Sequence, residues 1–296
     1  MKAHKIYNRV TNHIEFECTP NAEGLSFLYT TFPGQALSKF FLNRHLISAF
    51  YGKYVKSRKS ASQIPKYIKQ YNINVSEVKR PIDSFQSLND FFIRELKPEA
   101  RPVDPEPGHL ISPADSRLLV FDLARKSDLP VKGYWYSLKE FLKEETLTDE
   151  YADGWCFIYR LSPSDYHRYC YIDSGYQEKV ERIPGVLHSV NPIALSAVKS
   201  LLSKNYRELV ILHTDNFDKV LHLEIGALLV GKIVQHCNAG CHFKRGEEKG
   251  WFEFGGSTIV QLFKKDAIKP DNDILEHSAD HIETLVKMGE RVGNKV

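Results

Sequence analysis

The chain has 296 residues, of which 42% are hydrophobic and 26% are charged, a composition that is typical of globular proteins and excludes a disordered one. Its formal net charge is only +3, which gives no indication of nucleic-acid binding. No apolar run approaches the ~20 residues of a membrane-spanning helix. The sequence therefore predicts a protein that is soluble or attached to a membrane surface.

The cysteines are odd in number and show no disulfide-framework spacing. They are Cys18, Cys156, Cys170, Cys237 and Cys241. This pattern predicts a reducing compartment. The first ten residues are polar and no apolar signal segment follows them, so we expect a protein that meets a membrane from its cytoplasmic side.

Residues 25–80 are expected to be helical, because apolar residues recur there at intervals of three, four or seven. The apolar stripe consists of Leu37, Phe40, Ile47, Phe50, Tyr51 and Tyr54. Between residues 36 and 80 there are ten Lys or Arg residues and a single acid, Glu77. Such a cationic amphipathic helix either packs on the core with a solvated basic back or lies among the headgroups of an anionic bilayer.

Further helical segments are predicted to begin at Pro65 and at Ser87, the latter continuing to Leu96. Four prolines and a glycine between residues 97 and 108 then form an irregular connector. We take this connector as a domain boundary. It separates a helical, membrane-associating region, residues 1–96, from a catalytic domain, residues 97–296.

The second region is expected to be rich in β-strands, because short apolar and β-branched runs alternate with turn residues. The runs are Leu118–Phe121, Cys156–Leu161, Val186–Val190, Leu209–His213, Val220–Ile225, Leu228–Val234 and Thr258–Phe263. Helices are expected within it at residues 138–144 and 192–203. The whole chain is therefore predicted to be α+β, with N-terminal amphipathic helices before a mainly antiparallel sheet.

The segment Gly255-Gly256-Ser257-Thr258 interrupts the predicted strands and has two interpretations. Two glycines are typical of a hairpin turn. Alternatively, the Ser257 hydroxyl attacks the carbonyl of Gly256, which no Cβ shields and which can adopt a strained backbone. Elimination and hydrolysis would then convert Ser257 into a pyruvoyl group, whose ketone forms a Schiff base with an amine and accepts electrons.

Self-cleavage of this kind needs a base and a group that orients it. Asp115 follows a proline-directed turn, and His167 follows a predicted strand. An isolated Asp in a turn, or a His beside Arg168, is more often structural than catalytic. None of these residues identifies a catalytic site by itself.

Together with their surroundings, these residues resemble the phosphatidylserine decarboxylase family of pyruvoyl enzymes. The resemblance covers residues 85–265 and keeps both order and spacing. Its segments are FQSLNDFF (85–92), RELK (94–97), ARP (100–102), SPAD (112–115), DYHR (165–168), SVNP (189–192), GA (226–227), VG (230–231), and then Lys244, Gly246-Glu247, Lys249-Gly250, Phe252 and GGST (255–258).

The resemblance implies a proenzyme that cleaves itself between Gly256 and Ser257. The products would be a β chain, residues 1–256, and an α chain, residues 257–296, which begins with the covalent pyruvoyl cofactor made from Ser257. Family members use an Asp/His/Ser set for this step, and Asp115 and Ser257 match it. His167 would reprotonate the substrate carbon after CO2 leaves, and the product would be phosphatidylethanolamine.

The family resemblance also decides between the two interpretations of the cationic helix. The substrate, phosphatidylserine, lies in an anionic membrane surface, which a basic amphipathic helix can contact. We therefore expect a peripheral protein on the cytoplasmic face of the cell membrane. The processed α and β chains would form a heterodimer that can assemble further, with no nucleic-acid partner.

Two positions depart from the family pattern. The family usually has a second histidine three residues after the first, as the partner of Asp and Ser in self-cleavage, where this chain has Cys170. Ser116 replaces the glycine that usually follows Asp115. Either Cys170 acts as a thiolate, or His167 serves both steps, or processing is slow or absent.

Two other functions remain open at this point. One is a pyruvoyl decarboxylase of a soluble amino acid, and the other is an unprocessed lipid-binding relative without catalysis. The segment His236–His242 offers two His and two Cys residues as metal ligands, but an ordinary turn is the preferred interpretation and no metal is expected. His188 and His213 are expected to form hydrogen bonds near the core, and Arg207 either contacts a phosphate headgroup or forms a surface ion pair.

Overall fold

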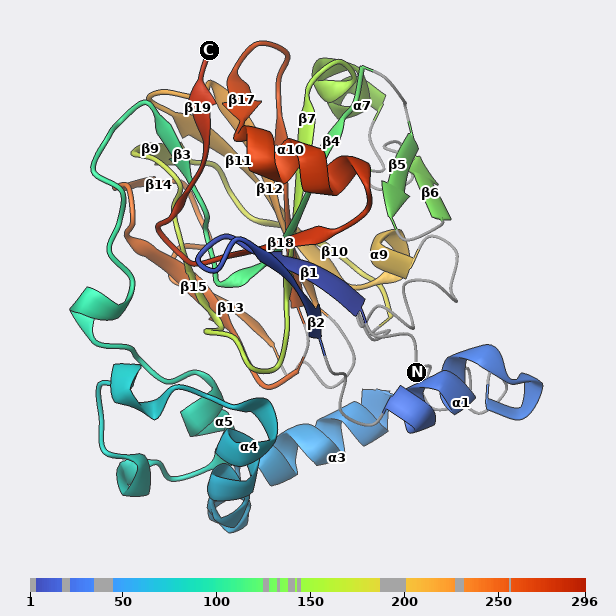
Figure 1. The fold of residues 1–296 in the computed structure, drawn as a ribbon, viewed down its shortest axis with the longest axis vertical. Helices are drawn as coiled ribbons and strands as arrows, with labels where there is room; N and C mark the ends of the chain where they lie inside the picture. The colour runs from blue at the N-terminus through green and yellow to red at the C-terminus, as the bar shows by residue number, and fades with distance from the viewer. Residues whose placement is uncertain are drawn as a thin grey trace.

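The computed structural model describes residues 4–17, 22–34, 45–124, 128–131, 134–137, 142, 145–186, 201–226, 232–255 and 257–296. Most helices of the described chain precede residue 100, and mainly antiparallel sheets follow (Figure 1). The predicted α+β fold class is confirmed. In the described part, no helix combines the length and apolarity needed to cross a bilayer.

The centre of the fold is an 11-stranded sheet. Its strands are, in spatial order, β14 (Cys241–Phe243), β9 (Gly175–Gln177), β11 (Arg207–Thr214), β12 (Lys219–Gly226), β16 (Ser257–Phe263), β7 (Trp155–Leu161), β4 (Ser116–Asp122), β18 (Glu283–Val286), β1 (His4–Asn8) and β2 (His13–Glu17), with β10 (Glu181–Ile183) paired to β11. Neighbouring strands are antiparallel except β1 and β18, which are parallel. The predicted strands of β4, β7, β11, β12 and β16 are confirmed.

Both faces of this sheet are covered, so its central strands are apolar on both sides. In β16, Ile259 and Phe263 join one hydrophobic core, while Val260 and Leu262 join the other. The first core lies against a small sheet of β13 (Ile233–Gln235), β15 (Glu248–Phe252) and β8 (Arg168–Cys170). Every residue of β16 is buried as a result.

The second core is closed by helices. Tyr29 of α1 (Ala22–Thr30) and Tyr151 of α7 (Glu145–Tyr151) are both buried in it. Another helix, α10 (Asn272–Ala279), lies over β4 and β18, and its Ser278 hydroxyl accepts a hydrogen bond from the Val120 amide at 3.0 Å (Figure 1). The remaining elements are α9 (Leu201–Lys204), a three-stranded sheet of β17 (Ile268–Pro270), β19 (Arg291–Lys295) and β3 (His109–Ile111), and a pair formed by β5 (Asp128–Val131) and β6 (Tyr134–Ser137).

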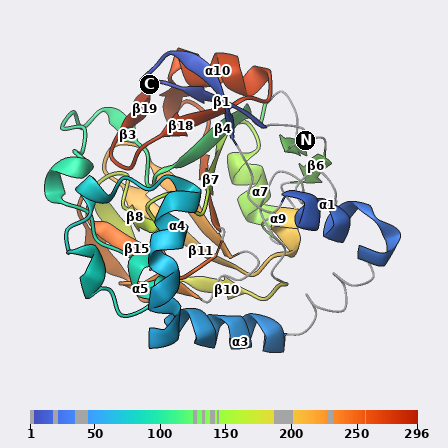
Figure 2. The same ribbon diagram turned by 60° about the horizontal axis from the view of Figure 1, so that its bottom comes forward.

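Three of the helices that precede residue 97 form a separate small core, whereas α1 packs on the second core of the main sheet; Figure 2 shows the three along one side of the sheets. They are α3 (His45–Lys56), α4 (Ile64–Tyr71) and α5 (Leu88–Phe92), with short 3-10 turns at Arg58–Gln63, Val75–Glu77, Ile82–Ser84 and Pro98–Ala100. Val55, Tyr67 and Phe91 are buried in this core, and Phe254 of the second region packs against it. The helical region therefore contacts the chain two residues before Gly256.

The sequence does not predict the N-terminal hairpin of β1 and β2, which extends the main sheet. Its residues are polar, and its parallel partner β18 lies more than 270 residues away in the chain. The division at residue 97 stays a prediction, although β1 and β2, within residues 4–17, join the sheet of the second region. The predicted helix at 138–144, most of that at 192–203, and strand residues 187–190 and 228–231 lie outside the described residues.

Candidate active site

Three central strands of the main sheet begin or end at the same end of the sheet, and the predicted site residues are found there. Ser257, the first residue of β16, pairs with Leu161, the last of β7, and with Gly226, the last of β12. On the other side of β7, Arg117 near the start of β4 pairs with Arg160 near the end of β7. Asp115, just before β4, therefore lies at the same end of the sheet. Two strand spacings, ~10 Å, separate the backbones of β4 and β16.

The Ser257 side chain is fully buried, and its hydroxyl has no hydrogen-bond partner among the described residues. Buried polar groups are seldom left unpaired, and exceptions often have a catalytic role. Gly255 has φ +146°, a conformation that side chains disfavour. Gly256 itself lies outside the described residues. The backbone at Gly255, between β15 and β16, therefore departs from the extended geometry of a continuous strand.

His167 is fully buried between the two regions. Its ring lies 3.9 Å, centroid to centroid, from that of Phe92 in α5. Its Nδ1 is 3.1 Å from the carbonyl oxygen of Asp165, and its own carbonyl accepts a hydrogen bond from the Phe252 amide at 2.9 Å. The latter contact ties His167 to the end of β15, three residues before Gly255.

The pKa of His167 is lowered to about 3, mainly by burial and also by the positive charges of Arg94 and Arg117, while hydrogen bonds to the backbones of Asp165 and Gly255 oppose the shift. The imidazole is therefore neutral at pH 7 and can accept a proton. Its Nε2 forms no geometrically good hydrogen bond within the described chain. The Gly255 backbone, which also lies beside this ring, leads directly to Gly256 and Ser257.

Asp115 is buried and held by Arg101 and the backbone of a C-terminal loop. Arg101 donates from Nε to Oδ1 at 2.7 Å and from Nη2 to Oδ2 at 2.5 Å, and the Met288 amide donates to Oδ1 at 2.9 Å. Arg101 also donates to Glu77 at 3.0 Å. Although its burial acts to lower the pKa of Arg101, the two carboxylates raise it overall, so the Asp115 carboxylate has a permanent cationic partner.

Cys170, in β8, lies beside the turn that carries Asp115. Its amide donates to the Pro113 carbonyl at 2.9 Å, and its Sγ lies 4.0 Å from the Ser112 carbonyl oxygen. Burial raises the pKa of this thiol to about 12, so it is protonated at pH 7. Ser116 is also buried and donates to the Ala114 carbonyl at 3.3 Å, which places its hydroxyl inside the same turn.

The sequence analysis does not identify Arg94 and Arg117, which border the site. Both are buried; Arg94 donates to the carbonyls of Ser164 and Asp165 at 3.4 Å, and Arg117 bonds to the Asp165 carboxylate. The sequence feature that could have identified Arg117 is its position within the otherwise apolar strand β4. Such a residue needs a buried acidic partner.

The sequence also predicts the surroundings of His188, His213 and Arg207. His213 is part-exposed, and its Nε2 lies 2.6 Å from Glu178, while His188 lies outside the described residues. Arg207 is fully buried and donates to the carbonyls of Ser203 and Asn205 at 2.6 and 3.1 Å. The expectation of a surface ion pair or a headgroup contact for Arg207 is therefore wrong, because its strand β11 turns the side chain inward.

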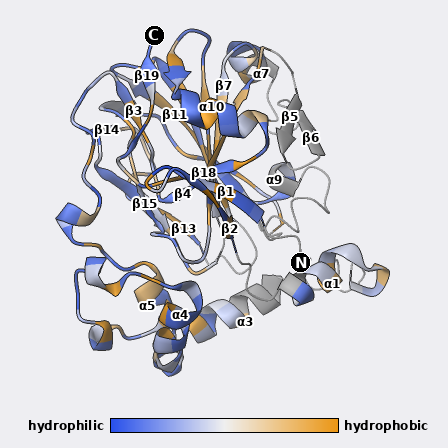
Figure 3. Ribbon diagram, viewed as in Figure 1, coloured by the Kyte–Doolittle hydropathy of each residue, from blue (hydrophilic) through white to orange (hydrophobic). Residues whose placement is uncertain are grey.

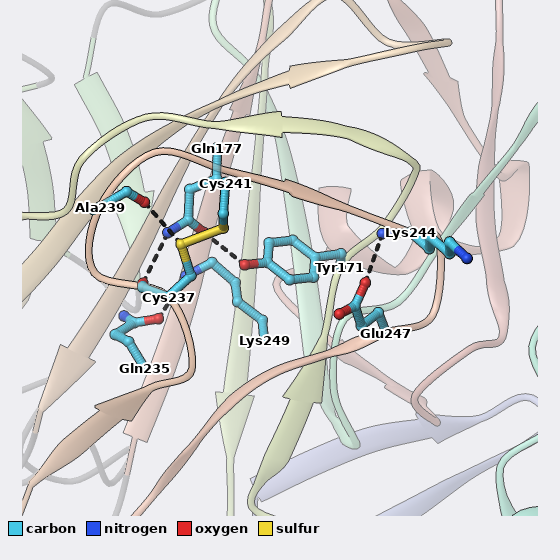
Figure 4. The surroundings of a disulfide bond; sticks show 9 residues. All are labelled: Tyr171, Gln177, Gln235, Cys237, Ala239, Cys241, Lys244, Glu247 and Lys249. Atoms are coloured by element: carbon cyan, nitrogen blue, oxygen red, sulfur yellow. Dashed lines mark hydrogen bonds between the residues drawn. A yellow bond between two sulfur atoms is a disulfide. The ribbon is translucent and has the colours of Figure 1, made fainter.

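The segment His236–His242 is a turn, as preferred, but its cysteines are bonded to each other. Cys237 and Cys241 form a disulfide, with Cα atoms 6.7 Å apart (Figure 4), which the absence of a disulfide-framework spacing does not predict. Gly240 lies beside the end of the Tyr176 side chain, whose hydroxyl would be 1.9 Å from a Cβ at this position. Cys156 and Cys170 are free, and the described residues contain no group of three or more potential metal ligands.

Comparisons with known proteins find relatives along almost the whole chain. The sequence profile of the family described as phosphatidylserine decarboxylase matches residues 88–294. A protein of Clostridium perfringens named phosphatidylserine decarboxylase proenzyme is 43% identical over 292 residues, covering 98% of this chain and 99% of its own. One of Clostridium botulinum with the same name is 40% identical over 293 residues, covering 99% of each chain.

Proposed function

Because this chain belongs to the phosphatidylserine decarboxylase family of carboxy-lyases, we propose that it cleaves its own Gly256–Ser257 bond and then decarboxylates phosphatidylserine to phosphatidylethanolamine. The observation that carries the proposal is the buried Ser257 hydroxyl, which has no partner in the described chain. Two residues earlier, Gly255 has a positive φ, and its backbone lies beside the neutral imidazole of His167. A nucleophile, an accessible carbonyl and a base are the groups that self-cleavage requires.

In the proposed cleavage, the Ser257 hydroxyl attacks the Gly256 carbonyl carbon and its proton passes to the His167 imidazole. The bond between that carbon and the Ser257 nitrogen breaks, and the nitrogen takes the proton from His167. In the resulting ester, the His167 imidazole, neutral again, takes the Ser257 α-proton, and the bond between the Ser257 Cβ and the ester oxygen breaks, which leaves dehydroalanine at 257 and a carboxylate on Gly256. Hydrolysis of the dehydroalanine releases ammonia and leaves the pyruvoyl group on the chain 257–296.

Asp115 and Cys170 have supporting roles in this proposal. The Asp115 carboxylate, held by Arg101, provides the negative charge that favours the protonated imidazole while His167 carries the proton. Cys170 does not act as a thiolate, since its pKa is raised to about 12 by burial. Its amide instead fixes the turn before Asp115 through Pro113, and His167 serves both cleavage and decarboxylation.

In the mature enzyme, the pyruvoyl ketone supplies a carbonyl that condenses with the substrate amine and accepts the electron pair left by CO2. His167 returns a proton to the substrate carbon, which requires an imidazolium. The Gly256 carboxylate created by cleavage follows Gly255, whose backbone lies beside His167. A carboxylate near an imidazole raises its pKa, so cleavage itself prepares His167 to donate.

We propose that the substrate is reached from the cytoplasmic face of an anionic membrane through the N-terminal helices. Phe32, just after α1, is 86% exposed, Phe50 of α3 is 70% exposed, and Phe27 and Tyr54 are also exposed; Figure 3 shows hydrophobic positions on α1. Lys56 of α3 pairs with Glu253 at 2.6 Å. The proposed membrane surface and the cleavage position therefore adjoin.

Intact-mass analysis of freshly purified protein tests the cleavage and the cofactor together. We expect fragments of residues 1–256 and 257–296, the latter lacking the Ser257 amine and reactive toward hydrazine. A single full-length chain without a carbonyl would instead support the unprocessed lipid-binding relative, which the thiol at Cys170 favours. Cleaved protein that decarboxylates a soluble amino acid but not phosphatidylserine in vesicles would support the small-substrate alternative.

A further inference from the structure

A buried line of charged side chains connects the N-terminal hairpin with the loop that carries His167. Arg160 of β7 donates to Glu17 of β2 at 2.7 Å and to Glu283 of β18 at 2.6 Å. The Nε of Arg117 lies 2.8 Å from the other Glu17 oxygen, and Arg117 also bonds to the Asp165 carboxylate. Glu17 thus accepts a hydrogen bond from Arg160 and forms an ion pair with Arg117 whose geometry makes no hydrogen bond, and Arg117 joins the hairpin to the loop.

These groups are almost inaccessible to water, which makes their arrangement rigid. The side chains of Arg117, Arg160 and Glu283 are 8%, 6% and 3% exposed, and those of Glu17 and Asp165 are 11% and 10% exposed. Removing one member of such a cluster leaves its partner as an uncompensated buried charge. Although its burial acts to raise the pKa of Glu17, the two arginines lower it overall, so Glu17 stays ionised.

Asp165 transmits this arrangement to the catalytic ring. Its carboxylate accepts a hydrogen bond from the Ser162 amide at 2.7 Å, and its own amide donates to the Ser162 carbonyl at 2.9 Å. These bonds close the loop that follows β7. The Asp165 carbonyl oxygen in turn lies 3.1 Å from His167 Nδ1. A shift of the Asp165 side chain would therefore move the acceptor that orients the imidazole.

We infer that Glu17 and Arg117 are positioning residues for His167, so that the last residue of β2 takes part in orienting the catalytic ring. The inference rests on the proposed function, in which His167 moves the proton for cleavage and decarboxylation. It assigns Glu17 a role in the reaction in addition to any role in folding. Reaction rates are sensitive to displacements of ~1 Å in such groups.

The hairpin provides a matched control in Arg9. This residue pairs with Asp271 at 2.9 Å, Asp273 at 2.7 Å and Glu290 at 3.0 Å. Its ion pairs therefore attach the same hairpin to α10 and the loop before β19, away from residues 162–167. If the hairpin matters only for stability, Arg9→Gln and Glu17→Gln should have similar effects.

The test compares Glu17→Gln, Arg9→Gln and the unaltered protein. For Glu17→Gln we expect the first-order cleavage rate and the kcat on phosphatidylserine vesicles to fall at least tenfold, with KM within twofold. Arg9→Gln should keep both rates within twofold even where its melting temperature drops as much. Arg117→Lys, which keeps the charge but cannot bridge two carboxylates, should give intermediate rates. Equal rates in Glu17→Gln and the unaltered protein would overturn the inference.

A second measurement does not depend on turnover. In Ser257→Ala protein, which cannot form the pyruvoyl group, the His167 ring nitrogens can be assigned by NMR against the double variant with His167→Gln. Adding Glu17→Gln should shift the Nδ1 signal, and adding Arg9→Gln should not. Unchanged His167 signals would refute the positioning role, whereas absence of cleavage in the unaltered protein would refute the proposed function and leave this readout valid.

Discussion

At the scale of the residue, burial determines which groups can act. His167 and Cys170 lie three positions apart and are both fully enclosed, yet burial favours the neutral form in each case. For His167 the neutral form is a base, and for Cys170 it is an unreactive thiol. Burial thus suppresses the chemistry of Cys170, one of the two residues that depart from the family pattern, and the proposed proton transfer is assigned to His167.

The pKa of His167 predicts a specific loss of stability in acid. Its value is about 3 in the folded chain and ~6.5 in the unfolded one. Between these values the unfolded state binds more protons, so the contribution is complete above pH 6.5 and is lost as the pH falls towards 3. We expect the free energy of unfolding of Ser257→Ala protein to fall by up to ~1.4 kcal/mol per pH unit from this group.

Urea unfolding at pH 7, 6 and 5 measures this slope. His167→Gln should reduce it, and the fully buried His222, whose pKa burial also lowers, should supply what remains. His213→Gln is the control, because that ring is part-exposed. An undiminished slope in His167→Gln would mean that the imidazole is solvated or already charged in the folded protein.

At the scale of the element, the sequence predicts a feature when the residues that determine it are close together in the chain, and does not when they are far apart. The apolar runs predict β4, β7 and β16, since a strand buried on both faces is visible from its own residues. The family resemblance adds the positions of Asp115, His167 and Ser257. The role of Arg117 is not predictable in this way, because its partners Glu17 and Asp165 lie 100 and 48 residues away from it in the chain. The same holds for the hairpin of β1 and β2.

The helices before residue 97 are predicted to bind anionic membranes through exposed aromatic side chains. Phe32 and Phe50 are 86% and 70% exposed, and replacing both with serine should weaken co-sedimentation with phosphatidylserine vesicles about tenfold or more, since each buries apolar area in the bilayer. Val75→Ser, at a residue that is 43% exposed in the same region, should leave binding unchanged. Equal losses in both proteins would indicate general destabilisation, and no loss in either would exclude these helices as the membrane contact.

At the scale of the whole molecule, the proposed cleavage divides the chain without dividing the fold. The segment after Gly256 contributes β16 to the middle of the main sheet and β18 to its outer part, with β7 and β4 between them. β16 pairs along its length with β12 on one side and β7 on the other. The chain 257–296 is therefore interleaved with strands of the chain 1–256.

We accordingly expect the two chains to remain associated after cleavage. Ile259, Val260, Leu262 and Phe263 are fully buried, and each contributes ~1.5–3 kcal/mol when removed from water, before any hydrogen bond of the sheet is counted. The cleaved protein is diluted to ~1 nM and analysed by native size-exclusion chromatography. At this concentration the chains would separate if their dissociation constant were above ~1 nM, which corresponds to a binding free energy of ~12 kcal/mol. We expect one species that contains both chains. Uncleaved Ser257→Ala protein marks its elution position. Loss of the smaller chain on dilution would mean that β16 leaves the sheet once its covalent link is broken, and the mature enzyme would then need another contact to retain its cofactor.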